Sequence, residues 1–214
     1  MYSKTCFIVA AGLTDVSDFP LPIKPGDLLI AADAGYKTLL DHSVKPDLVI
    51  GDFDSSDEPE GDFEVIRLPV EKDDTDTVYS VKEGFKRGFD RFLIYGALSG
   101  DRLSHTAANI QLLSMIDEMG GSAKMIFGGT TVFTVSGSKS EMIRGNAGDH
   151  ISLFSLSETA LVSASDLYYP VTQLTIKRSF PLGVSNHLTG EEAHIQVHKG
   201  EVLVITETVT TSAP

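Results

Sequence analysis

The pattern of apolar residues changes near residue 130, and this change most constrains the fold. Before it, five short runs are apolar almost throughout: 7–11, 28–32, 48–50, 92–97 and 123–127. Such runs are typical of strands buried on both faces of a parallel sheet. Helical periodicity lies between them, in 35–42, 75–88 and 103–119. On the last helix, the predicted apolar face consists of Leu103, Ala107, Ile110, Leu113 and Ile116. The first part therefore predicts an open, mostly parallel α/β sheet with helices on both faces.

After residue 130, apolar and polar residues alternate, as is typical of strands with one buried face. Alternation is found in 131–135, 194–198 and 201–206, and less regularly in 151–154. The turn Lys199-Gly200 predicts a hairpin that joins the last two strands. No helix is predicted after Gly121. The second part therefore predicts an antiparallel β domain, either a sandwich or a barrel.

Composition restricts the classes of function. The 214 residues include 30 acidic and 17 basic side chains, which gives a formal net charge of −13. This charge repels nucleic acid and anionic membranes, so neither is expected as a partner. The same charge favours Mg²⁺ and cationic substrates, although solubility alone would also explain it.

The apolar segments indicate an intracellular protein. The single cysteine, Cys6, lies in an apolar run, where it is expected to fill the core rather than act as a nucleophile. No run is long enough to span a membrane, and no signal-peptide pattern is found. We therefore expect a cytoplasmic location.

The strongest functional signal is Gly51-Asp52-Phe53-Asp54-Ser55, which follows a short apolar run. In open parallel sheets, ligands bind beyond the carboxyl ends of the strands, which is where Asp52 and Asp54 are expected. Mg²⁺ prefers one or two carboxylates together with water and phosphate oxygens. A turn in which Asp54 or Ser55 caps the next segment would also explain these residues. Two acids beside a glycine at a strand end favour the metal site.

A second acidic motif, Glu71 to Thr77, precedes a predicted helix. Thr75 or Asp74 can cap that helix, and acids in its first turn suit the helix dipole. Capping explains one or two of the acids but not the whole motif. Asp76 is therefore a candidate third metal ligand, and Lys72 is a candidate phosphate contact.

A third motif, Gly96 to His105, leads from a strand into a helix through small residues. Its backbone N–H groups would point at an anion above the helix N-terminus. Arg102 suits bidentate contact with phosphate. Close packing alone would also require small residues here, and neither of the common glycine-rich nucleotide motifs is present. Asp33, after an earlier predicted strand, is a candidate ribose or base contact, or a helix cap.

In their order along the chain, these motifs resemble those of thiamine pyrophosphokinases. The resemblance extends over nearly the whole chain and rests on Ala32-Asp33-Ala34-Gly35, Gly51 to Ser55, Asp73 to Thr77, Gly96 to Asn109 and Gly183-Val184-Ser185-Asn186. It implies an α/β domain of residues 1–130 that binds nucleotide and Mg²⁺. It also implies a β-sandwich of residues 131–214 that contributes to thiamine binding and dimerisation.

The resemblance further implies an activity and a set of site residues. The activity is transfer of the diphosphate of ATP to the hydroxyl of thiamine, in a homodimer with active sites at the subunit interface. The implied catalytic residues are Asp52, Asp54, Asp76, Asp101 and Arg102, of which the first three bind Mg²⁺. The implied nucleotide contacts are Asp33, Gly35, Lys72, Thr75, Gly96, Ser99, Gly100 and His105. The implied thiamine contacts are Ser185 and Asn186.

Two departures from the family pattern concern this site. Where the family has an acid two residues after Arg102, this chain has Ser104, and an acid stands before the arginine at Asp101. Either Asp101 supplies the missing carboxylate or the site works without it. The chain also has no Trp to stack on thiamine. The candidates to replace it are Tyr168, Tyr169, Phe180 and His187.

Two other functions fit parts of the sequence. A strand followed by Asp52-Phe53-Asp54 also resembles aspartyl-phosphate phosphatases, in which Asp52 would be the nucleophile. A non-catalytic sensor that binds nucleotide and Mg²⁺ is the alternative from another class. The sequence has no evident Ser-His-Asp or Cys-His set. Positioning and charge neutralisation are therefore expected to carry phosphoryl transfer.

Overall fold

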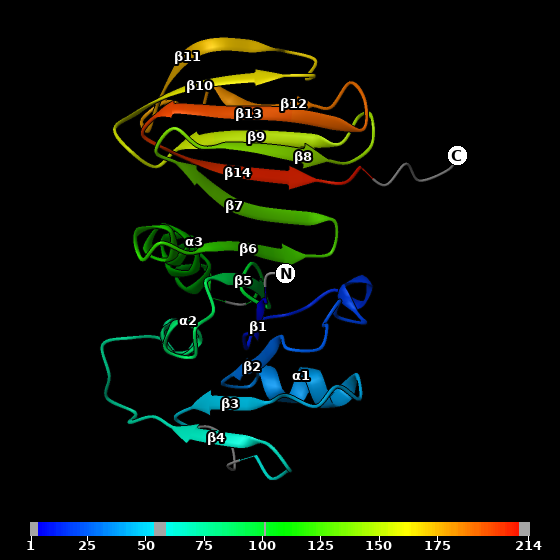
Figure 1. Cartoon of the computed structure of the whole chain (residues 1–214), viewed down its shortest axis with the longest axis vertical. Helices are drawn as coiled ribbons and strands as arrows, with labels where there is room; N and C mark the ends of the chain where they lie inside the picture. Colours follow the sequence, from blue (N-terminus) through cyan, green and yellow to red (C-terminus); the bar gives the residue numbers. More distant parts are fainter. Residues whose placement is uncertain (1–3, 54–58, 101, 210–214) are drawn as a thin grey trace. The chain divides into compact units, whose positions relative to one another are not determined.

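The chain forms two compact units, Met1–Gly128 and Gly129–Pro214, in the computed structural model (Figure 1). The structure describes residues 4–53, 59–100 and 102–209. Two predicted site residues, Asp54 and Asp101, lie outside these ranges. Within the same ranges, no helix has the length and apolar character needed to cross a membrane.

The first unit contains a parallel sheet with strand order β6-β5-β1-β2-β3-β4. Its strands are β1 (Cys6–Val9), β2 (Leu28–Ala32), β3 (Leu48–Gly51), β4 (Glu64–Arg67), β5 (Arg91–Tyr95) and β6 (Ser122–Phe127). The chain adds β2, β3 and β4 on one side of β1, and then places β5 and β6 on the other. The winding direction therefore reverses at β1, and open α/β sheets bind ligands at such a reversal.

Helices cover both faces of this sheet, as the sequence predicts. They are α1 (Gly35–Asp41), α2 (Asp76–Lys86) and α3 (Leu103–Glu118), with a short 3-10 helix, η1, at Val16–Asp18. Successive side chains of a strand point to opposite faces of the sheet. Phe7 accordingly packs in a core cluster with Leu39 of α1. Its neighbour Cys6 faces Gly84 of α2, where an added Cβ would lie 3.2 Å from the cysteine Sγ.

Cys6 is a core residue, as its sequence context predicts. Its side chain has no exposed surface, and burial raises the pKa of its thiol to about 12. The reactive thiolate is therefore a negligible fraction at neutral pH. Packing rather than chemistry explains this cysteine.

The second unit is an antiparallel β-sandwich, which decides between the sandwich and the barrel. One sheet has the order β12-β9-β14-β7 and contains β7 (Thr130–Ser136), β9 (His150–Ser155), β12 (Gly183–His187) and β14 (Glu201–Glu207). The other has the order β11-β10-β13-β8 and contains β8 (Ser140–Arg144), β10 (Thr159–Ser165), β11 (Val171–Lys177) and β13 (Glu192–Lys199). Alternate side chains of both sheets form one apolar core, to which Ile195 and Val204 belong.

The predicted hairpin at Lys199-Gly200 is wrong. β13 pairs with β8 and β10, whereas β14 pairs with β7 and β9, so the turn passes the chain from one sheet to the other. Gly200 has a φ of +84°, and an added Cβ would lie 2.6 Å from the carbonyl oxygen of Thr159. Alternation cannot distinguish the two arrangements, because each strand buries one face in either case.

The apolar face of α3 also differs from the prediction. Leu103 is 81% exposed, and the buried residues of the helix are Asn109, Leu112, Leu113 and Ile116. Only the later turns of α3 pack on the unit's core, while its first turn borders a cavity. The predicted face is therefore right for Leu113 and Ile116 and wrong for Leu103, because the first turn does not pack on the sheet.

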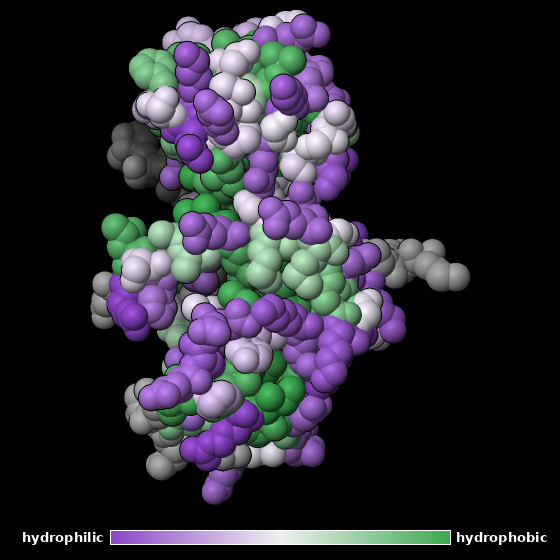
Figure 2. Space-filling model, turned by 90° about the vertical axis from the view of Figure 1, so that its left-hand side faces the viewer, coloured by the Kyte–Doolittle hydropathy of each residue, from purple (hydrophilic) through white to green (hydrophobic). Residues whose placement is uncertain are grey.

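Hydrophilic residues spread over the face of the molecule shown in Figure 2, with hydrophobic residues reaching the surface in separate areas. This mixture is ordinary for a folded protein. Three exposed aromatic residues of the second unit, Tyr168, Tyr169 and Phe180, are each about 60% exposed. All three are among the candidates for stacking on thiamine.

Candidate active site

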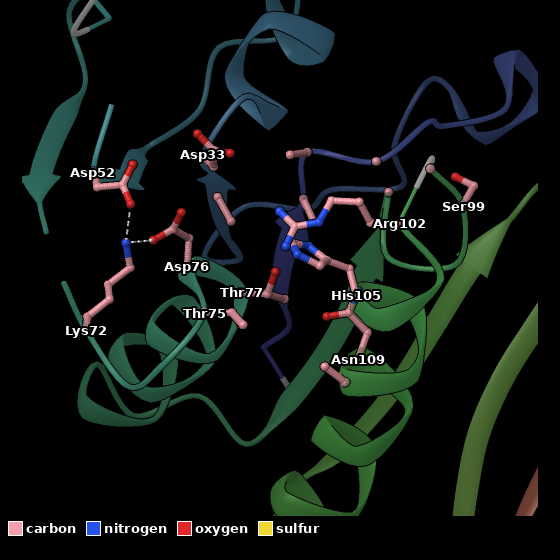
Figure 3. Close-up of a pocket in the computed structure, with 17 residues that line it drawn as sticks. Asp33, Asp52, Lys72, Thr75, Asp76, Thr77, Ser99, Arg102, His105 and Asn109 are labelled. Carbon is pink, nitrogen blue, oxygen red and sulfur yellow. Dashed lines mark hydrogen bonds and ion pairs between the residues drawn. The ribbon is translucent and has the colours of Figure 1, made fainter. Parts of the chain in front are cut away.

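A cavity of about 470 Å³ lies beyond the carboxyl ends of β1, β2 and β5 (Figure 3). Loops that follow these strands line it, together with the segment before α2 and the first turns of α2 and α3. This is the place at which the reversal of strand order predicts a ligand site.

Most site residues predicted in the first unit come together in this cavity. They are Asp33, Asp52, Lys72, Thr75, Asp76, Gly96, Ser99, Gly100, Arg102 and His105. Gly35 does not line it. A Cβ on Gly35 would lie 2.0 Å from the carbonyl oxygen of Val9, so the structure gives this glycine a packing role.

The acids of the motif before α2 have different positions. Asp74 forms an ion pair with Lys82 and does not line the cavity. Thr75 is the N-cap of α2, and its hydroxyl accepts a hydrogen bond from the N–H of Val78 at 3.2 Å. Thr75 and Asp76 both line the cavity. Capping and a role in the site are therefore compatible at Thr75.

Lys72 bridges two of the predicted metal ligands. Its Nζ donates to Oδ2 of Asp52 at 2.5 Å and lies 3.0 Å from Oδ1 of Asp76 (Figure 3). The three side chains are at most 16% exposed. The ammonium offsets charge on Asp76, whose Oδ1 has no other partner among the described residues. Lys72 thus occupies the space between the two carboxylates.

The ionisation of this group follows from its burial and charges. Burial raises the pKa of Asp76, the nearby Lys72 opposes this rise, and the charges of Asp52 and Asp33 add to it. Burial lowers the pKa of Lys72, but its interactions with Asp52 and Asp76 raise it by more. With both carboxylates ionised, one ammonium leaves an excess of negative charge. A divalent cation in place of the ammonium would balance both carboxylates.

The residues present suit Mg²⁺ in part. Among the described residues, no group of three His, Cys, Asp or Glu side chains could hold a metal ion. Mg²⁺ needs only one or two protein carboxylates when phosphates and water complete its coordination, and Asp52 and Asp76 provide two. The two carboxylates that hold the ammonium fit such an ion in its place. The third predicted ligand, Asp54, is outside the described ranges.

Two residues at this edge of the sheet have an unusual backbone conformation. Asp33 has a φ of 51° and Phe53 a φ of 53°, in the left-handed region that non-glycine residues seldom adopt. The N–H of Asp33 donates to the carbonyl of Ile50 at 2.7 Å, and the side chain of Phe53 is buried. Such conformations persist where surrounding structure holds them, and they cluster at functional sites.

The opposite side of the cavity carries Arg102, His105 and Asn109, at the start of α3 (Figure 3). Arg102 is the N-cap residue of α3, where backbone N–H groups also favour an anion. Its planar guanidinium group suits bidentate hydrogen bonding to phosphate. Nδ2 of the buried Asn109 donates to the carbonyl of Ala97 at 2.9 Å and so fixes the loop after β5. The cavity is thus acidic on one side and basic on the other.

Sequence reasoning assigned no individual role to Asn109, Thr77 or Gly12, which also line the cavity. Asn109 and Thr77 are polar residues on the inner faces of helices, and both are less than 10% exposed. These two residues could have been identified from the sequence, because each is polar at a helix position that the periodicity predicts to be buried. Gly12 follows β1 with no motif around it.

Close backbone contact explains Gly12. Its N–H donates to the carbonyl of Gly96 at 3.0 Å, and Oγ of Ser99 donates to the carbonyl of Leu13 at 2.5 Å. A Cβ on Gly12 would lie 2.3 Å from the carbonyl oxygens of both Gly96 and Ser99. Only glycine therefore lets the loops after β1 and β5 meet at the wall of the cavity.

In the second unit, the predicted thiamine contacts lie on strand β12. Ser185 has a φ of 60°, and the pairing of β12 with β9 is irregular there. Oδ1 of Asn186 accepts from the N–H groups of Tyr169 and His187, and its Nδ2 donates to the carbonyl of Tyr169. The rings of Tyr168 and His187 stack with centroids 4.7 Å apart. Asn186 thus fixes the backbone of Tyr169, which has an exposed ring.

Fold and cavity together define a class of protein. A cavity with paired carboxylates on one side and an arginine at a helix N-terminus on the other suits an enzyme that transfers phosphate groups. Two family models match the chain: "Thiamin pyrophosphokinase, catalytic domain" over residues 20–123 and "Thiamin pyrophosphokinase, vitamin B1 binding domain" over residues 138–202. The chain belongs to the thiamin pyrophosphokinase family.

Solved structures share this fold over nearly the whole chain. Thiamine pyrophosphokinase from Bacillus subtilis has a TM-score of 0.86 and 25% identity, covering 97% of this chain and 100% of that one. Thiamin pyrophosphokinase from Geobacillus thermodenitrificans has a TM-score of 0.82 and 22% identity, covering 98% of this chain and 100% of that one. Thiamin pyrophosphokinase from Candida albicans has a TM-score of 0.79 and 14% identity, covering 97% of this chain and 90% of that one. No curated protein matches.

Family membership establishes the activity as transfer of a pyrophosphoryl group to thiamine. The predicted family, fold class and function are therefore confirmed. The same finding favours this activity over the phosphatase and the sensor.

Proposed function

We propose that the chain transfers the diphosphate of ATP to the hydroxyl of thiamine, with Mg²⁺ held by Asp52 and Asp76. The opposed charges of the cavity carry this proposal, because a metal–nucleotide complex needs a cation site and a phosphate site close together. Asp54 and Asp101 belong to the proposed catalytic set by resemblance alone. Cytoplasmic location remains part of the proposal.

Catalysis rests on positioning and charge neutralisation in this proposal. The thiamine oxygen bonds to the β-phosphorus, the bond from that phosphorus to the oxygen of AMP breaks, and the hydroxyl proton passes to Asp76 or Asp101. Arg102 stabilises the negative charge on the phosphates. Bound Mg²⁺ would neutralise phosphate charge and orient the phosphate oxygens.

The remaining cavity residues bind the nucleotide in this proposal. Gly96, Ser99 and Gly100 present a small-residue loop to the phosphates, and Thr75 and His105 border it. Asp33 contacts the ribose or the base. Lys72 contacts a phosphate.

We further propose that the second unit binds thiamine through Ser185 and the exposed rings of Tyr168 and Tyr169. The match to a vitamin B1 binding domain supports this placement. The side chain of Asn186 serves the site by holding Tyr169 in place. The active enzyme is a homodimer in which this surface completes a site of the partner subunit.

The activity is tested by product identity. Incubation with ATP, Mg²⁺ and thiamine should release AMP and thiamine diphosphate in equal amounts, and omission of thiamine should stop both. Nucleotides and thiamine esters are separated by chromatography. Release of inorganic phosphate without thiamine, with a phosphoryl group trapped on Asp52, would support the phosphatase instead. Nucleotide binding without turnover would support the sensor.

Shared sites are tested by mixing two inactive chains. One carries Asp52→Asn, and the other carries Tyr168→Ala with Ser185→Ala. After subunit exchange at equal amounts, about a quarter of wild-type activity should return, because half of the dimers are mixed and each has one intact site. The controls are each variant alone after the same exchange. Mixed dimers verified by mass spectrometry that show no recovery would refute the shared site.

A further inference from the structure

We propose that Lys72 occupies the cation position of the site in the absence of nucleotide, and that its transfer to the nucleotide phosphates makes Mg²⁺ and nucleotide binding cooperative. This inference rests on the proposed function of Asp52 and Asp76 as metal ligands. It adds a specific competitor, a lysine of the chain itself, for the same pair of carboxylates.

The geometry shows why the two cations exclude each other. Nζ of Lys72 lies between the carboxylates, 2.5 Å from Asp52 and 3.0 Å from Asp76 (Figure 3). Mg²⁺ binds carboxylate oxygens at about 2.0–2.1 Å, so an ion held by these same two oxygens would overlap the ammonium. Lys72 must leave before such an ion can enter.

The cost of moving Lys72 depends on where its charge can go. The side chain is 9% exposed, and an ammonium in such a position is costly without a partner. Without nucleotide, a metal ion that displaces the Lys72 ammonium takes both of its carboxylate partners and gives it no new partner. With nucleotide bound, the phosphates offer acceptors within the same cavity. The metal should therefore bind weakly alone and more tightly with nucleotide.

Local structure allows this movement. Lys72 precedes α2, which begins at Asp76 and is capped independently by Thr75. Displacing the side chain therefore breaks no helical hydrogen bond. Lysine also suits the role, since it carries a compact point charge on a flexible stem, unlike the rigid fork of arginine.

The test measures Mg²⁺ binding directly by calorimetry, with and without a non-hydrolysable ATP analogue. Lys72→Met keeps most of the length of the side chain and removes its charge. We expect this variant to bind Mg²⁺ alone about tenfold or more tightly than the wild type. The increase in Mg²⁺ affinity caused by nucleotide should shrink by a similar factor. The matched control is Lys82→Met, which removes a lysine paired with Asp74 outside the cavity and should bind like the wild type.

Each outcome bears on the proposal. Equal or weaker Mg²⁺ binding by Lys72→Met, compared with the wild type, would overturn the role of Lys72 and leave the metal site standing. Absence of Mg²⁺ binding to both proteins, with nucleotide present, would overturn the metal site as well. If circular dichroism shows that the variant does not fold, the wild type alone decides the question. Nucleotide that changes its Mg²⁺ affinity by less than about twofold would then refute the coupling.

Discussion

Replacing Asp52 or Asp76 by Asn is expected to lower turnover by about a hundredfold or more, the scale of losing one stabiliser of transition-state charge. These are the two described carboxylates that face the proposed cation, and both contact Lys72. Asn keeps the shape of each side chain and removes its charge. Initial rates of AMP release at saturating ATP and thiamine, over a range of Mg²⁺ concentrations, measure the effect.

Stability should change little in these variants. From sequence, clustered carboxylates are expected to repel one another, so that removing one would stabilise the protein without metal. The structure shows Lys72 between the two acids, so each variant removes an ion pair as well as a repulsion. Lys72 keeps the other carboxylate as its partner in each variant, so we expect a change within about 1 kcal/mol in the free energy of unfolding without metal.

The matched control for both variants is Asp74→Asn. Asp74 belongs to the same motif, but it pairs with Lys82 and does not line the cavity. Its turnover should stay within about twofold of the wild type, since exposed ion pairs contribute little. If Asp52→Asn and Asp76→Asn both keep near-normal turnover at saturating Mg²⁺, these carboxylates are not the metal site.

Gly12→Ala should reduce turnover by about a hundredfold, because it moves the loop that leads to Arg102. The added Cβ would lie 2.3 Å from two backbone carbonyl oxygens, those of Gly96 and Ser99. Backbone cannot rotate away as a long side chain can, so the loop after β5 must shift. That loop leads directly into the N-terminus of α3.

Gly12→Ala should also destabilise the protein by about 1–3 kcal/mol, the range for overpacked sites. Thermal unfolding measures this effect, and kcat with KM for ATP measures the displacement of the site. The control is Gly190→Ala, where an added Cβ meets nothing within 4 Å. Normal kinetics in a folded Gly12→Ala protein would show that the loops tolerate separation.

The sequence alone was sufficient for the fold class and for the strand-end acids. A fully apolar run indicates a strand that is buried on both faces, whereas an alternating run indicates a strand with one buried face. The carboxyl ends of parallel strands meet at one edge, so Asp33 and Asp52 were expected near each other. Strand β4 was missed because Glu64–Arg67 lies at the edge of the sheet, and its two charged end residues are exposed.

Tertiary structure alone decided which segments meet. β13 and β14 have the alternation of a hairpin yet belong to opposite sheets. Lys72 was expected to meet phosphate, and only the fold places its ammonium between Asp52 and Asp76. Gly12 belongs to no sequence motif. A loop more than 80 residues later in the chain leaves no space for a side chain at this position. Local periodicity indicates how one segment is buried. The contacts named above join segments that are far apart in the sequence, and their approach depends on the packing of the whole unit.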